Sequence, residues 1–595
     1  MKSFIKIVLG SCLGVIVATL VVGLILSGIG AAMFASDSDQ GSIKANSVLQ
    51  LSLKDNIPQK TGNTEEAMFN FSDEPIIGQF DMIQAIEAAA EDKNIKGLYL
   101  TLGSKGVASA KAQDIRNAII SFKESGKFVY AYCGNYGYGQ SEYYIASAAD
   151  KVFIHPLGAV DFRGFGSEIP FFKDMLDKIG VKMATFYAGK YKGATEPLRL
   201  NKMSDENRLQ IKTYLSALYE SFLNDIGSSR DLSRNRLSAL ASELGGRTAE
   251  MALENGLVDE IKYADEVLDA LREALDLDED EKIPLISVVD YHKERDKDRN
   301  LGSNAKVAVL YAEGEIRAGK ETYGMITDQH YVDMIRKIGK DDKVKAVVIR
   351  INSPGGDAFV SDEIWRELEL LQEKDITVVA SMADIAASGG YYIACGADEI
   401  IAEANTITGS IGVFGVIPNV QELMNDKLGI HMDTVKTERY ATGVVSSFYP
   451  IGKDEAKLIQ ESIDRIYRIF LDRVAEGRQM SIDDVHEIAQ GRIWTGAKAK
   501  EIGLVDRLGD LDYAIARAVE IAEIEDYRIT EYPRIKDPMQ KLLEELTSSK
   551  GSTVLQDRLL KTYFPSSAAL LMEFEQLLNQ SNRPMARLPF AGLQY

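Results

Sequence analysis

The sequence predicts an α/β protein built from two tandem copies of one domain behind an N-terminal membrane-spanning helix. Three observations lead to this prediction. Four sequence blocks recur in the same order, short apolar runs alternate with amphipathic helical patterns, and an uncharged apolar segment opens the chain. The recurrence indicates the number of domains, the alternation indicates the fold class, and the apolar segment indicates a membrane anchor.

The opening segment is uncharged and predominantly apolar from residue 7 to residue 35, with two lysines before it and two aspartates soon after it. About 20 apolar residues span a bilayer, whereas the apolar region of a cleaved signal peptide has roughly 7–15. The flanking charges orient the N-terminus toward the cytoplasm. Residues 1–36 are therefore predicted to be a retained transmembrane anchor, with the rest of the chain outside the cytoplasmic membrane.

The internal repeat divides the remainder of the chain. Four pairs of segments match at a nearly constant offset of about 249 residues: 92–106 with 341–355, 141–153 with 389–401, 180–194 with 429–443, and 254–261 with 501–508. Self-similarity at one fixed spacing is the signature of a duplicated domain. The predicted domains are 37–295 and 296–530, joined by the highly charged stretch 291–306. Residues 531–595 form a partly helical tail to which no function is assigned.

Within each copy, short apolar runs alternate with helical patterns. In the second copy, "KAVVIRI" (345–351) and "ITVVAS" (376–381) flank the amphipathic "VSDEIWRELELLQEK" (360–374). This alternation is typical of βαβ units and predicts a mainly parallel sheet. The apolar runs have no strict polar alternation, as expected for strands that are covered on both faces.

Bulk composition excludes several classes of protein. The formal net charge of −21 leaves no basic excess to neutralise phosphates, so a nucleic-acid partner is not expected. Three cysteines in 595 residues cannot make a disulfide framework.

A candidate oxyanion hole lies in "NSPGG" (352–356), where a predicted strand ends and Asp357 opens a helix. Paired glycines at such a turn allow backbone N–H groups to point into a cleft, at the positive end of a helix dipole. Fixed donors of this kind are what a developing oxyanion requires. An isolated Pro-Gly-Gly is more often a plain β–α turn.

A candidate nucleophile is Ser388 in "AASGG", which also lies between a predicted strand and a predicted helix. Serine is a common helix cap, so the residue alone is ambiguous. The two turns, however, lie 32 residues apart in one βαβ frame. Both are at the carboxyl ends of strands, where parallel sheets bind their ligands.

No histidine offers a base for this serine. None stands in a Gly-x-Ser-x-Gly or His-Glu-x-x-His context, and each position is explained by packing, exposure or a charged linker. The five are His155, His292, His330, His431 and His486.

The repeat itself offers a base. When the two copies are aligned, Lys192 of the first copy falls on Ala441 of the second, and Ser388 of the second copy falls on Gln140 of the first. "GSKGV" in the first copy replaces "NSPGG", so each copy keeps only part of a site. A lysine acts as a general base when burial lowers its pKa. Without this complementary loss, an exposed loop lysine would be the simpler interpretation.

Four motifs together resemble the long, two-repeat signal peptide peptidases, a family also called protease IV. They are "YKGATEP" (191–197), "NSPGGD" (352–357), "AASGGYY" (386–392) and "TGSIGVFG" (408–415). The resemblance runs from the N-terminal segment to about residue 530. It implies that the fold class is α/β, a tandem repeat of two Clp/crotonase-like βαβ domains behind the transmembrane helix.

The resemblance also implies roles for individual residues. Ser388 would be the nucleophile and Lys192 the general base and acid of a Ser-Lys dyad. Ser410 would orient the lysine, and the backbone N–H of Gly355 or Gly356 would form the oxyanion hole. The dyad would need neither a metal nor a cofactor.

The neighbouring Lys190 is a possible confusion, but the motif of the family places its lysine after Tyr191, which selects Lys192. Family members act on peptide substrates left in the membrane after secretion and assemble as homotetramers. The predicted function is thus a membrane-anchored serine endopeptidase that degrades signal peptides. Its location would be the bacterial cytoplasmic (inner) membrane, with the catalytic domain on the periplasmic side.

Three alternatives stay open at this stage. A Ser-Lys membrane quality-control protease would share every motif. A non-catalytic membrane scaffold would share the fold, although a scaffold gives no reason for two complementary half-sites. A crotonase-type acyl-CoA hydratase or thioesterase would use similar backbone amides, but such enzymes fit poorly with an anchored, extracytoplasmic body.

Overall fold

The structure, a computed structural model, describes residues 43–53, 57–62, 76–103, 106–296, 303–320, 324–534 and 585–587. Among these residues no helix combines the length and apolarity needed to cross a bilayer. The predicted anchor, residues 1–36, lies outside the described residues. So does most of the predicted tail, and its helical pieces cannot be compared with the structure.

The first repeat is built on a parallel six-stranded sheet in the order β8-β5-β3-β2-β1-β9. Its strands carry buried aliphatic residues on both faces, which explains their uninterrupted apolar sequences. The strands are β1 (Ser47–Leu53), β2 (Ile95–Leu102), β3 (Phe128–Cys133), β5 (Lys151–Ile154), β8 (Glu260–Ile261) and β9 (Leu285–Ser287), with a small separate pair β4 (Gly137–Tyr138) and β6 (Ala159–Val160).

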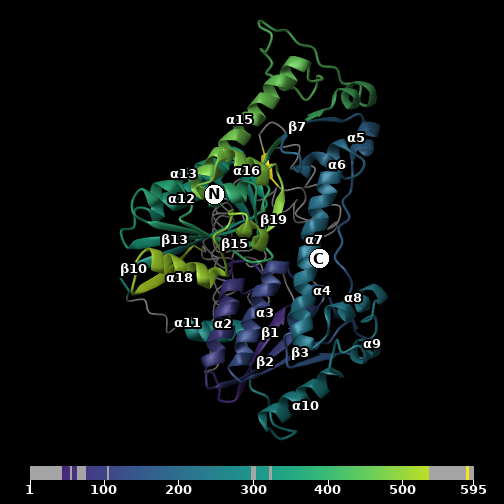
Figure 1. Cartoon of the computed structure of the whole chain (residues 1–595), viewed down its shortest axis with the longest axis vertical. Helices are drawn as coiled ribbons and strands as arrows, with labels where there is room; N and C mark the ends of the chain where they lie inside the picture. Colours follow the sequence, from purple (N-terminus) through teal and green to yellow (C-terminus); the bar gives the residue numbers. More distant parts are fainter. Residues whose placement is uncertain are drawn as a thin grey trace, which may run out of the picture.

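Helices surround this sheet in the lower part of Figure 1, and the long helix α7 runs from it toward the second repeat. The helices of the first repeat are α2 (Gln79–Glu91), α3 (Ser109–Glu124), α4 (Gln140–Ala146), α5 (Lys173–Ile179), α6 (Glu196–Arg199), α7 (Asp205–Arg230), α8 (Arg234–Glu243), α9 (Ala249–Glu254), α10 (Ala264–Leu275) and α11 (Val288–Asp296). Of these, α5 and α6 lie away from the sheet, in the upper part of Figure 1.

The second repeat has an eight-stranded sheet in the order β19-β17-β15-β13-β10-β21, with β16 and β20 branching from β15. All its pairings are parallel except that of β17 with β19. The strands are β10 (Ala305–Glu313), β13 (Val344–Ser353), β15 (Thr377–Ala387), β16 (Glu399–Ala402), β17 (Ile407–Gly409), β19 (Ile493–Thr495), β20 (Arg507–Leu508) and β21 (Tyr527–Tyr532).

The helices of the second repeat are α12 (Asp328–Ile338), α13 (Ala358–Gln372), α14 (Gly389–Ala394), α15 (Lys453–Arg478), α16 (Ile482–Ile488), α17 (Gly496–Glu501) and α18 (Leu511–Ile521). The predicted α/β class and the tandem repeat are confirmed, since β2 and α4 of the first copy recur as β13 and α14 of the second.

A third sheet joins the two repeats. Its order is β12-β11-β14-β22-β18-β7, formed by β11 (Glu315–Arg317), β12 (Met325–Thr327), β14 (Gly355–Asp357), β18 (Val413–Asn419), β22 (Met585–Arg587) and β7 (Lys182–Ala188). Strand β7 comes from the first repeat and pairs antiparallel with β18 of the second along its whole length. A domain boundary drawn along the sequence therefore assigns β7 to one repeat, whereas its hydrogen bonds place it in the sheet of the other.

The predicted linker is shorter than the charged stretch 291–306. Helix α11 continues to Asp296, and Tyr291 at its centre is fully buried in the core of the first repeat. Strand β10 already begins at Ala305. The charged composition is misleading because a mostly charged helix can still bury one aromatic residue, Tyr291, in the core.

Buried polar contacts dock the two repeats onto each other. Arg350 of β13 is 2 % exposed, and its guanidinium donates to Gln59 of the first repeat at 3.0 Å. The same guanidinium lies 3.8 Å from the Asp114 carboxylate of α3. A buried cation without partners would be costly, so these contacts hold the repeats in one relative position.

Candidate active site

Ser388 occupies the turn between β15 and α14 in a strained backbone conformation, with φ 57° and ψ −114°. Its N–H donates to the Gly409 carbonyl at 2.8 Å, and its side chain is fully buried. A non-glycine residue at such a φ costs on the order of 1–3 kcal/mol and persists only where its surroundings enforce it. A sharp strand–turn–helix of this kind projects the side chain away from the sheet, which suits a nucleophile.

Lys192 reaches this serine from the other repeat. It follows β7, and the pairing of β7 with β18 carries it across the domain boundary. Its Nζ lies 2.7 Å from the Ser388 Oγ, although the two residues are 196 positions apart in the chain. The side chain is 1 % exposed. The structure thus brings together the two half-sites that the sequence comparison separated.

Burial alone lowers the pKa of Lys192 well below its ordinary value of 10.5, because desolvation penalises the charged form. The environment therefore favours a neutral amine, which is the form that can accept a proton.

Ser410 fixes the direction of that amine. Its carbonyl oxygen accepts from Lys192 Nζ at 2.9 Å, and its Oγ lies 3.1 Å from the same nitrogen. A neutral amine has two N–H groups and one lone pair. With both hydrogens taken by Ser410, the lone pair faces the Ser388 hydroxyl. Ser410 is itself held at φ 50° by an N–H donated to the Arg492 carbonyl at 2.7 Å.

The two glycines of the predicted oxyanion hole differ in their surroundings. The Gly355 N–H donates to Ser353 Oγ at 3.2 Å. The Gly356 amide nitrogen lies 3.1 Å from the position that a Cβ on Gly389 would occupy, directly beside the chain that follows Ser388. A Cβ on Gly356 would itself fall 1.9 Å from the Ile316 carbonyl oxygen, so only glycine fits there. Of the two, Gly356 therefore has its amide nitrogen next to the chain that follows Ser388.

Sequence reasoning missed a backbone cradle for the lysine. A Cβ on Gly491 would lie 2.7 Å from the Lys192 Cβ, and a Cβ on Gly189 would lie 2.4 Å from the Gln490 carbonyl carbon. The Tyr191 N–H also donates to the Gln490 carbonyl at 2.9 Å. In sequence Gly491 reads only as a turn after α16. Nothing near it in the chain indicates a contact with residue 192.

Helix α7 ties the same region to the second repeat. The Gln210 side chain donates to the Tyr191 carbonyl at 2.9 Å and accepts from the Ile493 N–H at 3.2 Å. Farther along α7, Tyr214 and Leu218 pack against Ala387, the residue before the serine. The helix thereby positions both sides of the site.

The rejected alternatives have other contacts. Lys190 is exposed, with its ammonium 5.3 Å from the centre of the Tyr191 ring. His155 accepts from the Leu157 N–H at 3.1 Å, and His486 lies 3.1 Å from the Tyr467 hydroxyl. Within the described ranges, no cluster of three or more histidine, cysteine or acidic side chains could hold a metal ion.

The corresponding place in the first repeat is filled by side chains. The Gly106 N–H donates to the Glu142 carboxylate at 2.6 Å, and the Val107 N–H donates to the Ser141 Oγ at 2.8 Å. Gln140, which aligns with Ser388, accepts from the Arg163 N–H at 3.2 Å. The two described amides that align with Gly355 and Gly356 thus both have side-chain acceptors, and a glutamine stands where the second repeat has Ser388.

Comparison with known proteins gives two kinds of match. The profile described as Peptidase family S49 matches residues 121–278 and 371–525, one segment in each repeat. "Protease 4" of Salmonella typhi is 35 % identical over 79 % of this chain and 76 % of its own length. "Serine protease SPPA, chloroplastic" of Arabidopsis thaliana is 34 % identical over 80 % of this chain and 70 % of its own.

Among solved structures, ClpP1 from Listeria monocytogenes is 17 % identical over 34 % of this chain and 91 % of its own, with a TM-score of 0.22. That score is too low to establish a shared fold. The kinship of each repeat with Clp proteases and crotonases therefore stays a prediction.

Proposed function

Because the chain belongs to peptidase family S49, we propose that it is a membrane-anchored serine endopeptidase with a Ser388–Lys192 dyad that degrades signal peptides after their release from preproteins. The observation that carries the dyad is the 2.7 Å approach of Lys192 Nζ to Ser388 Oγ in a buried site. The lowered pKa of the lysine gives the chemical reason why the serine can be activated.

The first half of the reaction forms an acyl-enzyme. The Lys192 lone pair takes the Ser388 hydroxyl proton while Oγ attacks the carbonyl carbon of the scissile peptide bond. The carbonyl oxygen becomes an oxyanion, to which the backbone N–H of Gly356, with Gly355 as the second predicted donor, offers fixed hydrogen bonds. The Lys192 ammonium then protonates the leaving amine, and the C–N bond breaks.

The second half regenerates the serine. A water molecule gives a proton to Lys192 and attacks the ester carbon, and the lysine returns that proton to Ser388 Oγ as the acid product leaves. Ser410 acts as a positioning residue through both halves, since its carbonyl accepts from Nζ in the neutral and in the charged state. The mechanism uses no metal and no cofactor.

The substrate class and location rest on the sequence resemblance. Small apolar residues around the site, Ala386, Ala387 and Val413, suit the apolar cores of signal peptides. The apolar segment before residue 36 would anchor the chain in the bacterial cytoplasmic membrane as a single pass, with the catalytic repeats on the periplasmic side.

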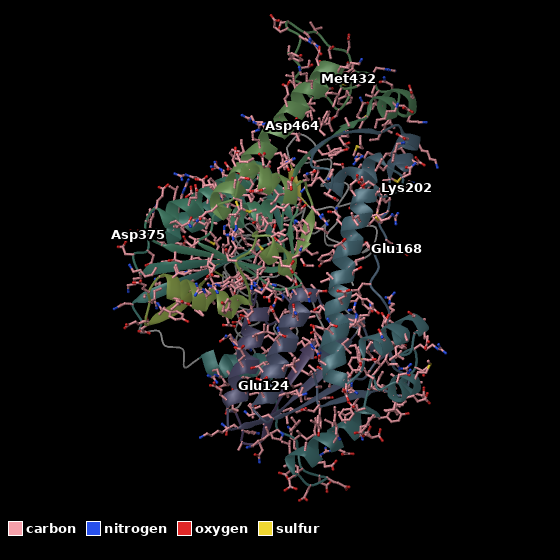
Figure 2. The ribbon with its side chains drawn as sticks, in the orientation of Figure 1. Glu124, Glu168, Lys202, Asp375, Met432 and Asp464 are labelled. Atoms are coloured by element: carbon pink, nitrogen blue, oxygen red, sulfur yellow. The ribbon has the colours of Figure 1, made fainter. Side chains whose placement is uncertain are left out.

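The proposal includes assembly as a homotetramer, and one surface supports self-association. The offset of 249 makes residues 431–437 the counterpart of β7, and this segment is exposed, with Val435 96 % accessible. Figure 2 shows Met432 near the outer end of the molecule. Residues 164–170, the counterpart of β18, form no strand. Residues 431–437 of one chain could therefore pair with residues 164–170 of another, in the way that β7 pairs with β18 within one chain.

A fluorophosphonate probe tests the dyad. We expect the detergent-solubilised protein to be labelled at Ser388, as mapped by mass spectrometry, and we expect Lys192→Ala to abolish labelling. Lys190→Ala is the matched control, because that lysine is two residues away but exposed, and it should label normally. Folded wild-type protein that takes no label, or a Lys192→Ala variant that labels at the normal rate, would refute the proposed mechanism.

A further inference from the structure

Three polar side chains that take no part in the dyad chemistry are buried together where the two repeats meet. Glu196, Asn207 and Gln210 are each at most 3 % exposed. Glu196 opens the short helix α6, and the other two lie one turn apart near the start of α7. Buried polar groups are stable only when they have hydrogen-bond partners, so the partners of these three show what the group does.

Glu196 sets the direction of a chain of hydrogen bonds, because a carboxylate only accepts. It accepts from the Asn207 Nδ2 at 2.9 Å. The Asn207 Oδ1 is then left to accept from the Gln210 Nε2, also at 2.9 Å. The Gln210 side chain consequently turns its nitrogen toward the loop that carries Lys192 and its oxygen toward β19.

Gln210 thereby joins two peptide groups of the candidate site. Its Nε2 donates at 2.9 Å to the Tyr191 carbonyl, which belongs to the peptide group leading into the proposed base. Its Oε1 accepts from the Ile493 N–H at 3.2 Å. That N–H shares a peptide group with the Arg492 carbonyl, the acceptor that holds Ser410 at φ 50°. One side chain therefore holds both the base and the residue that orients it.

The backbone around the network is adapted to it. A Cβ on Gly193 would lie 2.7 Å from three atoms of the Asn207 side-chain amide, so a larger residue there would displace that amide. The Ser204 hydroxyl donates to the Glu196 carboxylate and accepts from the Asn207 N–H as the N-cap of α7. The carboxylate that starts the chain of bonds is thus fixed to the first turn of the helix.

The second repeat shows that the helix itself does not need these side chains. Its counterpart α15 also has 26 residues and aligns with α7 at an offset of 248, with Arg478 for Arg230. The offset in the preceding loop is 249, as for the lysine. The replacements in the second repeat are Thr442 for Gly193, Val445 for Glu196, Glu455 for Asn207 and Leu458, 41 % exposed, for Gln210. The network is therefore present in the copy that has the lysine and absent from the copy that has alanine in its place.

We infer that Glu196, Asn207 and Gln210 are a positioning network, in which the carboxylate orients two side-chain amides and Gln210 fixes Lys192 and Ser410 relative to each other. This inference deepens the proposed peptidase function and rests on it. The network acts through the base and its acceptor, so its loss should lower kcat and leave KM nearly unchanged. A displacement of about 1 Å in a reacting group is enough to cost about 10²-fold in rate.

The first test replaces Gln210 by a side chain of similar size that forms no such bonds. We expect Gln210→Met to lower kcat for a fluorogenic peptide by about 10- to 100-fold, with KM within about twofold. The acid limb of the pH–rate profile should move to higher pH, because a lysine held less firmly is better solvated and its pKa rises toward 10.5. Thr213→Val is the matched control: this residue lies on the exposed side of α7, its hydroxyl donates to the Leu209 carbonyl, and its loss should leave kcat and the profile unchanged.

A second variant separates positioning from a general loss of stability. Glu196→Gln keeps the shape of the side chain, but an amide donates as well as accepts, so the two amides after it lose their fixed direction. Its kcat should fall and its acid limb should move in the same direction as in Gln210→Met. If Glu196 acts through Gln210, adding Glu196→Gln to Gln210→Met should lower kcat no further. Should Gln210→Met not fold, as judged by circular dichroism, the kcat and the acid limb of Glu196→Gln decide the question alone.

Three results would overturn the inference: a wild-type kcat in the folded variants, an acid limb at the wild-type pH, or losses that multiply in the double variant. Fluorophosphonate labelling distinguishes this failure from that of the peptidase function. Folded wild-type protein that takes no label refutes the peptidase function. Wild-type protein that is labelled at Ser388, with equal labelling rates in Gln210→Met and Glu196→Gln, refutes only the positioning network.

Discussion

The two repeats have the same strand–turn–helix arrangement around the candidate site, but different side chains line it. In the second repeat, Gly389 and Gly390 follow the proposed nucleophile Ser388 and have no side chains, and a Cβ on Gly389 would lie 3.1 Å from the Gly356 amide nitrogen. In the first repeat, the aligned positions are Ser141 and Glu142, whose oxygens accept from the equivalent amides.

A buried amide without an acceptor is costly, so a turn that no longer serves a substrate is stabilised by a side chain that takes its place. In the first repeat, the side chains at two positions that are glycine in the second repeat supply acceptors for the aligned amides. If the second repeat holds an oxyanion there, as proposed, the two glycines keep its donors free of such side chains.

The largest effect is expected from substitutions at the proposed nucleophile position, which is Ser388 in the second repeat and Gln140 in the first. Ser388→Ala removes the nucleophile and should lower kcat/KM by about 10³–10⁴-fold or more. Gln140→Ala, the change at the aligned position of the first repeat, should leave kcat/KM within about twofold, because no reacting group is lost. Steady-state hydrolysis of a fluorogenic peptide measures both. A comparable loss in the two variants would mean that the repeats share the chemistry, contrary to the comparison.

A smaller but still large effect is expected when the second repeat receives a serine at the position that aligns with Ser141 of the first. Gly389→Ser places a Cβ 3.1 Å from the Gly356 amide nitrogen and supplies a hydroxyl, as Ser141 does for Val107. Loss of one oxyanion donor costs about 10²–10³-fold in kcat.

Gly389→Ala is the control for this substitution, because it adds the Cβ without the acceptor and should cost less. Kinetics on both variants separate the contribution of the hydroxyl from that of crowding against Ser361, whose Oγ lies 2.6 Å from the new Cβ. Identical losses of kcat in the two variants would contradict a hydrogen bond from the Gly356 N–H to the serine hydroxyl.

The pH dependence of kcat/KM should reflect Lys192, which the first repeat supplies to the site. Burial lowers the pKa of Lys192 well below 10.5, and only the neutral amine can take the serine proton. As the pH falls through this lowered pKa the amine is protonated, so kcat/KM should fall about tenfold per pH unit below it. A pH–rate profile whose acid limb lies near 10.5 would show that the amine is solvated and would contradict the buried geometry.

The smallest effect is expected in the first repeat. Glu142→Gln keeps the shape of the side chain but weakens the hydrogen bond that it accepts from the Gly106 N–H. Free energies of unfolding should fall by about 1 kcal/mol, with kcat/KM unchanged within about twofold. Thermal or denaturant unfolding measures the first quantity. A large loss of activity would mean that the first repeat takes part in catalysis beyond the supply of Lys192.

The dyad residues and the parallel sheets could be predicted from the sequence, because the two copies of the domain can be aligned with each other. Offsets of 248 and 249 pair Ser388 with Gln140 and Lys192 with Ala441, and the residue lost from one copy is the one kept in the other. The parallel sheets followed from apolar runs such as 345–351, since strands buried on both faces need no polar alternation.

The rest depends on long-range pairings that leave no local trace. Nothing in "MATFYAG" indicates that β7 pairs with β18 of the other repeat, and nothing in "QGR" indicates that Gly491 contacts Lys192. Strand β22 is only three residues long and lies in a stretch that reads as tail. Its place in the sheet is set by the two edges that it meets and not by its own composition.

The crossing of β7 into the second repeat has a consequence for the timing of synthesis. On the proposed mechanism, the lysine leaves the ribosome 196 residues before the serine, which at about 5–20 residues per second is a delay of roughly 10–40 s. Throughout that interval the nascent chain carries a base without a nucleophile. Even after Ser388 has been synthesised, it remains an ordinary hydroxyl until β7 has paired with β18. On this mechanism, hydrolysis begins only after the two repeats have paired, so the unfinished chain carries no active peptidase.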